Sequence, residues 1–242
     1  AGDYLRLHLH DDLMISKKTG PTDLVTQMDQ QVQKDLVEKI THRYPEDRIF
    51  AEENGLRSPI SEGSVWVIDP IDGTNNFVTQ KEDFAVMVAY FEDGIGQFGL
   101  IYDVMRDHLF YGGGEFPVYR NEVELTPFVD QPLENLLIAS NVGMLEKNDW
   151  GMADLGMASL GIRVYGSAGI SFSKILSGGI LAYFSYIWPW DYAAAAIMGE
   201  QLGYTVLNLN GDKPNYQTVE PIMMVPKVKL TEIQTYLKKG RS

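Results

Sequence analysis

The chain has 242 residues, of which 45% are hydrophobic and 22% charged, and its net charge is −13. This length suits one large domain or two smaller ones, and the excess of acids argues against a nucleic-acid partner, because phosphate backbones are bound by basic surfaces. The chain has no Cys, which excludes disulfides, thiolate metal sites and a cysteine nucleophile and fits a cytoplasmic protein.

The first helices are predicted from leucine spacing and capping residues. Leucines four residues apart predict the end of a helix within residues 3–13. Residues 16–21 combine Lys, Thr, Gly and Pro and predict an exposed, mobile loop. Thr26 and Asp29 have the spacing of a capping box, which predicts a helix that ends before Pro45.

Apolar and β-branched runs predict an antiparallel sheet in the first half of the chain. Two of these runs flank a turn at residues 92–94 and form a predicted hairpin. The predicted strands are residues 49–51, 65–68, 84–90, 95–102 and 108–111.

From about residue 136 predicted strands alternate with predicted helices, which favours a more parallel αβ arrangement. The strands are residues 136–139, 163–165, 182–185 and 205–207, and the helices are residues 167–176 and 192–202. We therefore expect a mixed αβ (α+β) protein with an N-terminal subdomain at residues 1–132 and a C-terminal α/β subdomain at residues 133–242. No apolar run approaches the roughly 18 residues that span a membrane, so no membrane partner is expected. The chain begins at Ala1 rather than at a methionine, so the lack of a signal peptide is weak evidence.

The segment from Asp69 to Thr74 reads DPIDGT and follows an apolar strand. Taken alone, the two Asp residues are explained by a turn in which they cap backbone amides. Carboxylates at the end of a strand are also ligands for a hard divalent cation such as Mg²⁺. Gly73 allows close approach of the backbone to a phosphate, and the Gly73 and Thr74 amides open the next helix. The string therefore predicts a combined cation and phosphate site.

Further acids lie far from this string in the sequence. Glu52 and Glu53 follow a short predicted strand, where adjacent glutamates are usually solvated. Asp191 precedes a run of alanines and is predicted to be a helix N-cap, a role that leaves lone pairs for a metal. The four His are scattered and none has the spacing of zinc ligands.

These segments together resemble the inositol monophosphatase family, within the wider group of magnesium-dependent, lithium-sensitive sugar phosphatases. The resemblance covers nearly the whole chain. The matching segments are residues 23–29, 51–54, 66–77, 161–168 and 190–194. The family implies a layered αβαβα sandwich and a homodimer. It also implies two or three Mg²⁺ ions per site, Mn²⁺ as a possible substitute and Li⁺ as an inhibitor.

The resemblance implies a set of metal ligands. Glu52, Asp69 and the Ile71 carbonyl match ligands of a first ion, and Glu52 also helps to orient the attacking water. Asp69 bridges to a second ion, whose other ligands match Asp72 and Asp191. Most ligands would thus lie in the N-terminal subdomain, whereas Asp191 and the pocket for the substrate alcohol would lie in the C-terminal one.

The resemblance also implies groups that bind substrate or position the nucleophilic water. Asp72 and the Gly73 and Thr74 amides match substrate and phosphate contacts, and the Thr74 hydroxyl matches the group that positions the water. Asp29 matches the acid that hydrogen-bonds this threonine or a metal-bound water. Lys18 falls where the family has a basic residue close to the phosphate. Ala168 matches a position that lines the sugar pocket.

The expected function is hydrolysis of small phosphate monoesters such as inositol-1-phosphate by in-line attack of a Mg²⁺-activated water. Inositol-specific members carry a glutamate shortly before the tryptophan matched by Trp190, whereas residues 182–187 contain no acid and Ser185 is the nearest counterpart. Relaxed specificity for a phosphorylated polyol, sugar or nucleotide is therefore expected. The alternatives are fructose-1,6-bisphosphatase, NADP(H) phosphatase or 3′-phosphoadenosine nucleotidase activity, and, more remotely, a non-catalytic homologue that binds metal and phosphate.

Overall fold

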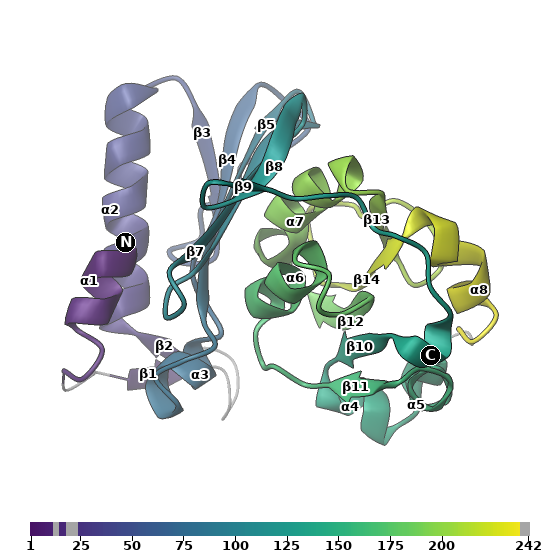
Figure 1. Cartoon of the computed structure of the whole chain (residues 1–242). Helices are drawn as coiled ribbons and strands as arrows, with labels where there is room; N and C mark the ends of the chain where they lie inside the picture. Colours follow the sequence, from purple (N-terminus) through teal and green to yellow (C-terminus); the bar gives the residue numbers. More distant parts are fainter. Residues whose placement is uncertain (12–14, 18–23, 238–242) are drawn as a thin grey trace.

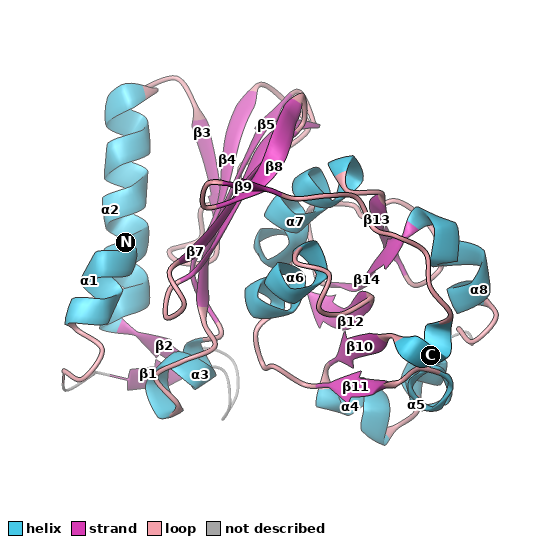
Figure 2. Cartoon of the chain, in the orientation of Figure 1, coloured by secondary structure: helices cyan, strands magenta, loops and turns pink. Residues whose placement is uncertain are grey.

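The computed structural model describes residues 1–11, 15–17 and 24–237. The described helices and strands stack in five layers in the order helix, sheet, helix, sheet, helix (Figures 1 and 2). The layered αβαβα sandwich expected from the sequence is therefore confirmed.

The N-terminal sheet is built from the strands between residues 48 and 124, which lie side by side in chain order from β3 to β9. Strands β3 and β4 run parallel, and the other neighbours run antiparallel. The strands are β3 (Arg48–Ala51), β4 (Ser64–Asp72), β5 (Ala85–Glu92), β6 (Ile95–Asp103), β7 (His108–Gly113), β8 (Phe116–Arg120) and β9 (Val123–Glu124).

Helices α1 (Gly2–Leu7) and α2 (Gln27–Arg43) cover the outer face of this sheet (Figure 1). The predicted capping box opens α2: the Thr26 hydroxyl accepts from the Met28 amide at 3.0 Å, and Asp29 Oδ2 accepts from the Thr26 amide at 2.7 Å. Beside the start of α2 lie a two-stranded ribbon within the described residues, β1 (Ile15–Lys17) and β2 (Leu24–Thr26), and the short helix α3 (Thr74–Thr79).

The C-terminal sheet has the strand order β11-β10-β12-β14-β13. Strand β10 pairs in parallel with β11 and β12, whereas β14 runs antiparallel to β12 and β13. The carboxyl ends of β10, β11 and β12 consequently meet at one edge of the sheet. The strands are β10 (Leu137–Ser140), β11 (Gly161–Arg163), β12 (Ala182–Ile187), β13 (Tyr204–Asn208) and β14 (Glu220–Pro226).

Helices α6 (Ala168–Leu176) and α7 (Pro189–Gln201) form the middle layer between the two sheets (Figure 1). The hydrophobic core around them joins side chains of both sheets and of α6, for example Phe50 and Val67 with Ile170 and Tyr183. The outer layer is α4 (Val142–Glu146), α5 (Met152–Ala158) and α8 (Leu230–Gln234), with 3₁₀ turns at Leu133–Asn135, Asp149–Gly151 and Lys227–Lys229. The predicted division at residue 132 falls in the connection between the sheets and stays a prediction, since one core links both parts.

The start of α7 differs from the prediction. The helix begins at Pro189, three residues before the predicted start, and its N-cap is Trp188 rather than Asp191. Proline is favourable at the first helical position because its missing N–H has no partner within the helix there. Asp191 instead occupies the third helical position, where its Oδ2 accepts from the Trp188 amide at 2.7 Å.

Other boundaries also differ. Strand β4 continues through Pro70 to Asp72 instead of ending before Asp69, and Ser16 and Lys17 lie in β1 rather than in a loop. The remainder of that predicted loop lies outside the described residues. Strands β8, β9 and β14 and the helices α4, α5 and α8 were not predicted.

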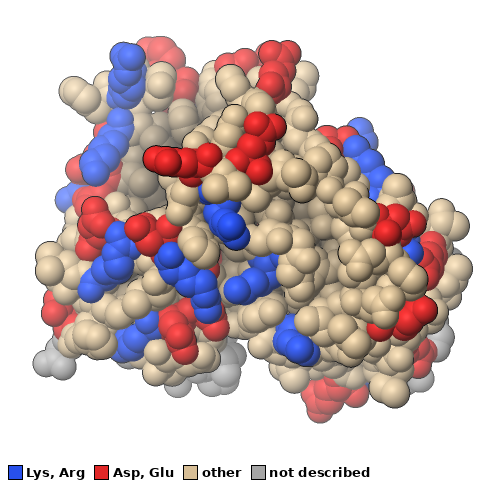
Figure 3. Space-filling model, viewed as in Figure 1, with Lys and Arg blue, Asp and Glu red and all other residues tan. Residues whose placement is uncertain are grey.

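The charged residues are unevenly spread over the surface. On the face drawn in Figure 3, Lys and Arg lie beside Asp and Glu over the N-terminal half, whereas the C-terminal half shows many uncharged side chains. Within the described ranges, no helix has both the length and the apolar character needed to cross a membrane.

Candidate active site

The end of β4 carries two buried acids and turns directly into α3. Asp69 and Asp72 are only 1% and 7% exposed, and the pairing of β4 with β5 shifts register between them. Gly73 has a φ of 87° and is the N-cap of α3. A Cβ there would lie 2.9 Å from the Cβ of Ser167. Glycine is therefore required for the chain to pass from strand to helix immediately after Asp72.

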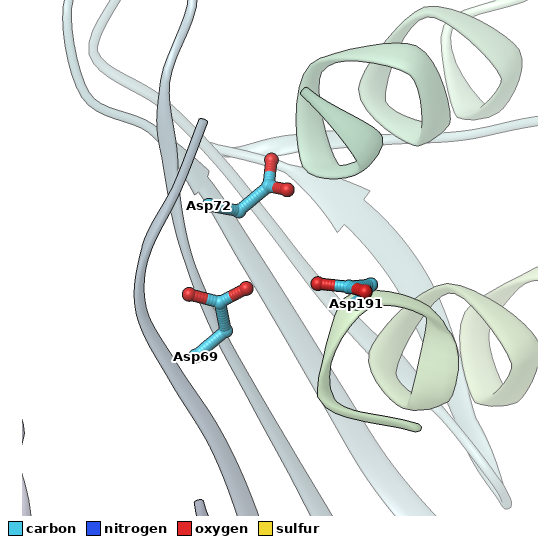
Figure 4. Close-up of side chains that lie close together, drawn as sticks. All are labelled: Asp69, Asp72 and Asp191. Carbon is cyan, nitrogen blue, oxygen red and sulfur yellow. The ribbon is translucent and has the colours of Figure 1, made fainter. Parts of the chain in front are cut away.

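A third carboxylate reaches this point from α7. One carboxylate oxygen of each of Asp69, Asp72 and Asp191 lies within 4.8 Å of the others. Figure 4 shows the three side chains converging, two from β4 and one from the first turn of α7. The structure thus brings together acids that are far apart in the sequence.

Burial and mutual repulsion raise the pKa values of these acids. The pKa of Asp69 lies well above its ordinary value because burial disfavours its charge and because Glu52, Asp72 and Asp191 repel it. The pKa of Asp191 is raised well above its ordinary value by burial and by the charges of Asp72 and Glu52. Burial also raises the pKa of Asp72, while hydrogen bonds from the start of α6 oppose the rise.

A divalent cation fits the three carboxylates. Among the described residues, Asp69 Oδ1 is buried and has no hydrogen-bond partner. Burying such an oxygen is costly unless something pairs with it. Hard cations such as Mg²⁺ bind carboxylate oxygens and would also relieve the repulsion between the acids. Asp69, Asp72 and Asp191 therefore have the chemistry of a cation site.

Glu52 adjoins the three acids from the end of β3. Its amide donates to the Ile68 carbonyl at 3.1 Å, which fixes it against β4. Its carboxylate is one of the charges that raise the pKa values of Asp69 and Asp191. The adjacent Glu53 is 6% exposed, and its amide donates to Gln33 Oε1 at 2.8 Å.

Asp72 is oriented by the start of α6. The Ser167 hydroxyl donates to Asp72 Oδ2, and the amides of Ala168 and Gly169 donate to Oδ1 and Oδ2 at 3.0 and 2.7 Å. Ser167 also caps α6 by accepting from the Ile170 amide at 3.1 Å. The carboxylate of Asp72 thus connects β4 to the middle helical layer.

Asp29 and Thr74 form a hydrogen-bonded pair beside the cluster. Thr74 Oγ1 lies 3.0 Å from Asp29 Oδ1 and 3.1 Å from the Ile71 carbonyl oxygen, either of which accepts from the hydroxyl. Asp29 Oδ2 accepts from the amide and the hydroxyl of Thr26, both at 2.7 Å. The capping box of α2 therefore fixes the acid that contacts Thr74.

A pocket of about 320 Å³ opens beside Asp72 and Asp191. Ala168 and Ser185 belong to its wall, as expected, and Asn141 and Tyr165 add polar atoms. The residues that line it are Asp72, Ser140, Asn141, Val142, Val164, Tyr165, Gly166, Ser167, Ala168, Tyr183, Ser185, Ile187 and Asp191. Among these described residues the charged side chains are the two acids, so the rest of the wall is neutral.

Sequence reasoning missed Asn141 and the role of Ser167. The Asn141 side-chain amide donates to Ser185 Oγ at 3.0 Å, and its Oδ1 caps α4 by accepting from the Met144 amide at 2.9 Å. Asn141 directly follows β10, at the carboxyl edge of a parallel strand pair, where ligands of αβ proteins commonly bind. The position of Asn141 directly after a predicted strand could have indicated that it lines the site. The position of Ser167 at the predicted start of α6 could have indicated its capping role.

The structure gathers nearly all the predicted site residues around one point. Glu52, Asp69, Asp72 and Asp191 are the acids, and Ile71, Gly73, Thr74 and Asp29 lie at the turn into α3. Lys18, predicted to lie near the phosphate, is outside the described residues.

Comparison with known proteins identifies the family. The sequence model described as "Inositol monophosphatase family" matches residues 1–239. The chain belongs to the inositol monophosphatase family. It is 36% identical over 218 residues to an inositol-1-monophosphatase of Bacillus subtilis strain 168, covering 88% of this chain and 82% of that protein.

Solved structures in this family share the fold. An IMPase/NADP phosphatase complexed with Mg²⁺ and phosphate superposes with a TM-score of 0.91 at 25% identity, covering 99% of this chain and 93% of the other. A 2′AMP-bound SaIMPase-II gives a TM-score of 0.86 at 28% identity, covering 98% and 89%. The family membership predicted from the motifs is confirmed, and the chain is a metal-dependent phosphoric monoester hydrolase.

Proposed function

We propose that this inositol monophosphatase family member uses Mg²⁺ to hydrolyse small phosphate monoesters, with relaxed choice of the alcohol. The observation that carries the proposal is the cluster of Asp69, Asp72 and Asp191, two of which, Asp72 and Asp191, line a pocket that is otherwise neutral. The acids supply the cation site, and the pocket offers space for the alcohol of the ester.

The acids of the cluster hold the cations in this proposal. Glu52, Asp69 and the Ile71 carbonyl would hold one Mg²⁺, and Asp69, Asp72 and Asp191 a second. When bound, such ions lower the pKa of water and stabilise charge on the leaving oxygen. Asp72 is held by Ser167 and the first amides of α6, so its carboxylate keeps one orientation before a cation arrives.

Thr74 and Asp29 orient the attacking water in this proposal. While the Thr74 hydroxyl donates to Asp29 Oδ1, its oxygen lone pairs accept a hydrogen bond from water. The amides of Gly73 and Thr74 would donate to phosphate oxygens. The predicted contact of Lys18 with the phosphate stays a prediction.

The pocket wall supports relaxed specificity. The position that corresponds to the glutamate of inositol-specific enzymes is Ser185, which is 4% exposed and accepts from Asn141. A neutral Ser–Asn pair binds alcohol hydroxyls without the charge-assisted hydrogen bonds that a carboxylate provides. Polyol, sugar and nucleoside alcohols are therefore all compatible with this wall.

The test is phosphate release from a panel of esters by the Mg²⁺-loaded enzyme. The panel is inositol-1-phosphate, 2′-AMP, NADP, fructose-1,6-bisphosphate and 3′-phosphoadenosine phosphate. We expect turnover of several esters, suppression by Li⁺, and a loss of roughly 100-fold or more in Asp69→Asn, because the cation site loses a ligand. Near-normal turnover by this variant would refute the assignment of Asp69, and no turnover by the unmodified enzyme would support the non-catalytic alternative.

The panel also separates the rival activities. The IMPase/NADP phosphatase and the 2′AMP-bound SaIMPase-II make nucleotides the first rivals to inositol-1-phosphate. A strong preference for one ester would replace relaxed specificity by that activity. The use of Mn²⁺, binding of two or three ions per site, the homodimer and the cytoplasmic location stay predictions.

A further inference from the structure

An aromatic cluster lies next to the site, between the segments that carry Glu52 and Asp191. Trp188 and Trp190 stack with ring centroids 4.8 Å apart and planes 9° apart, just before Asp191. Phe50, two residues before Glu52, packs against Trp190 with centroids 5.6 Å apart. The three rings thus bring the end of β3 to the start of α7.

The guanidinium of Arg57 lies against this cluster. Its central carbon is 4.6 Å from the ring centroid of Trp190, 5.6 Å from that of Phe50 and 5.9 Å from that of Trp188. These distances are in the range of cation–π attraction. Arg57 therefore contacts the aromatic residues of both segments at once.

The same guanidinium hydrogen-bonds the chain that carries Glu52. Arg57 Nη1 donates to the Ala51 carbonyl, and Nη2 donates to the Glu52 carbonyl at 3.3 Å. The planar, forked geometry of arginine allows stacking and donation together, whereas lysine has a compact ammonium that cannot do both.

We propose that Arg57 is a positioning residue for the cation site, because it fixes the Glu52 segment against the Trp188–Asp191 turn. This inference rests on the proposed metal site. Glu52 and Asp191 approach each other from separate segments, and without a cation the repulsion between their carboxylates opposes this approach. Contacts that hold both backbones in place reduce the reorganisation needed when a cation binds. Arg57 itself touches neither the substrate nor the reacting atoms in this role.

The test compares Arg57→Met, Arg57→Lys and a matched control, Arg43→Met. Arg43 also lies over an aromatic ring, that of Tyr44 at 5.7 Å, but at the far end of α2. Mg²⁺ affinity is measured by calorimetry on the metal-stripped full chain, the melting temperature is measured in EDTA, and turnover is measured across Mg²⁺ concentrations.

We expect Arg57→Met to raise the Kd for Mg²⁺ by about 10-fold, the range seen when groups that orient metal ligands are removed. Arg57→Lys should fall between this variant and the unmodified chain, and Arg43→Met should leave the Kd unchanged. The kcat of Arg57→Met should recover when Mg²⁺ is raised to saturation. Its melting temperature in EDTA should fall no further than that of Arg43→Met.

An unchanged Kd in Arg57→Met, or an equal increase in Arg43→Met, would overturn the inference. A kcat that stays low at saturating Mg²⁺ would also overturn it. If Arg57→Met does not fold, Arg57→Lys decides: a Kd equal to that of the unmodified chain refutes the role. If the unmodified chain binds no Mg²⁺, the proposed cation site itself fails, which is a separate outcome.

Discussion

At the scale of single residues, Asp72 depends on donors that come from another layer of the molecule. Ser167 is the one side chain among the three described donors to this carboxylate, since Ala168 and Gly169 donate through their amides. Ser167 also caps α6. One hydroxyl thus fixes both a helix start and the orientation of an acid in the proposed cation site.

Replacing Ser167 by Ala should therefore weaken both features. We expect a loss of about 1 kcal/mol in the free energy of unfolding from the missing cap. We also expect a rise of about 10-fold in the Kd for Mg²⁺, because Asp72 loses a group that orients it. Calorimetry and chemical denaturation measure the two effects.

Ser171→Ala is the matched control, because Ser171 is a buried serine of the same helix whose hydroxyl donates to the Ser167 carbonyl at 2.7 Å. Ser167→Thr should retain Mg²⁺ binding because it keeps the hydroxyl. Equal Mg²⁺ affinity in Ser167→Ala and Ser171→Ala would contradict the role given to Ser167.

The sequence predicted individual residues where local chemistry decides their position. The string from Asp69 to Thr74 contains the two acids and the glycine that opens α3, although β4 extends to Asp72 rather than ending before Asp69. The spacing of Thr26 and Asp29 predicted the capping box of α2. Asn141 was missed because its partner, Ser185, is on another strand. A contact of that kind depends on how β10 and β12 pair, which single-sequence patterns do not reveal.

At the scale of elements, the position of Asp191 depends on how closely α7 approaches the N-terminal sheet. Gly99 of β6 faces the helix, and a Cβ at this residue would lie 2.4 Å from the Ala194 carbonyl oxygen. The alanine run of α7 is buried against the sheet at this point. Small residues on both surfaces allow helix and strand to come into direct backbone contact.

Gly99→Ala should push α7 away from the sheet. Overpacking of this kind costs about 1–3 kcal/mol of folding free energy. Mg²⁺ affinity should also fall, because α7 carries Asp191. Urea denaturation and calorimetry test both effects.

Gly179→Ala serves as the control, since its Cβ would lie 3.4 Å from the nearest atom, the Lys174 carbonyl oxygen. A stability of Gly99→Ala equal to that of Gly179→Ala would show that the helix does not depend on this close approach.

Helices and strands were predicted correctly where a segment has one clear pattern of apolar residues or turn residues. The helix α2, the hairpin of β5 and β6 and the alternation of strands and helices after residue 136 follow from periodicity and turn residues. Strand β14 reads EPIMMVP and was not predicted, because prolines near both of its ends argue against a strand. It forms a strand by pairing antiparallel with β12 and β13. Helix α7 was predicted to start late because Trp-Pro-Trp has no polar N-cap residue.

At the scale of the whole molecule, the site holds several carboxylates close together where the two halves of the chain meet. The pKa values of Asp69 and Asp191 are raised well above the ordinary value of 3.8 in the folded chain. Between that value and the raised pKa, the folded state binds more protons than the unfolded state. The free energy of unfolding of the metal-free chain therefore decreases as pH rises through this interval.

This dependence can be measured by chemical denaturation in EDTA from about pH 5 to about pH 8. Asp69→Asn removes one of the titrating groups, so we expect its stability relative to the unmodified chain to increase with pH. Saturating Mg²⁺ should stabilise the unmodified chain more than the variant, because the cation binds the folded state. A pH-independent difference between the two proteins would rule out a raised pKa for Asp69.

The pocket shows how a new alcohol preference can arise in this fold. Its neutral wall comes largely from residues next to β10, β11 and β12, whereas Asp69 and Asp72 end β4 of the other sheet. A library that varies Asn141, Val164 and Ser185 would thus change the part of the molecule that meets the alcohol while inheriting the acids intact. Substitutions in the pocket wall can therefore change which ester is cleaved while the acids that hold the cations stay the same.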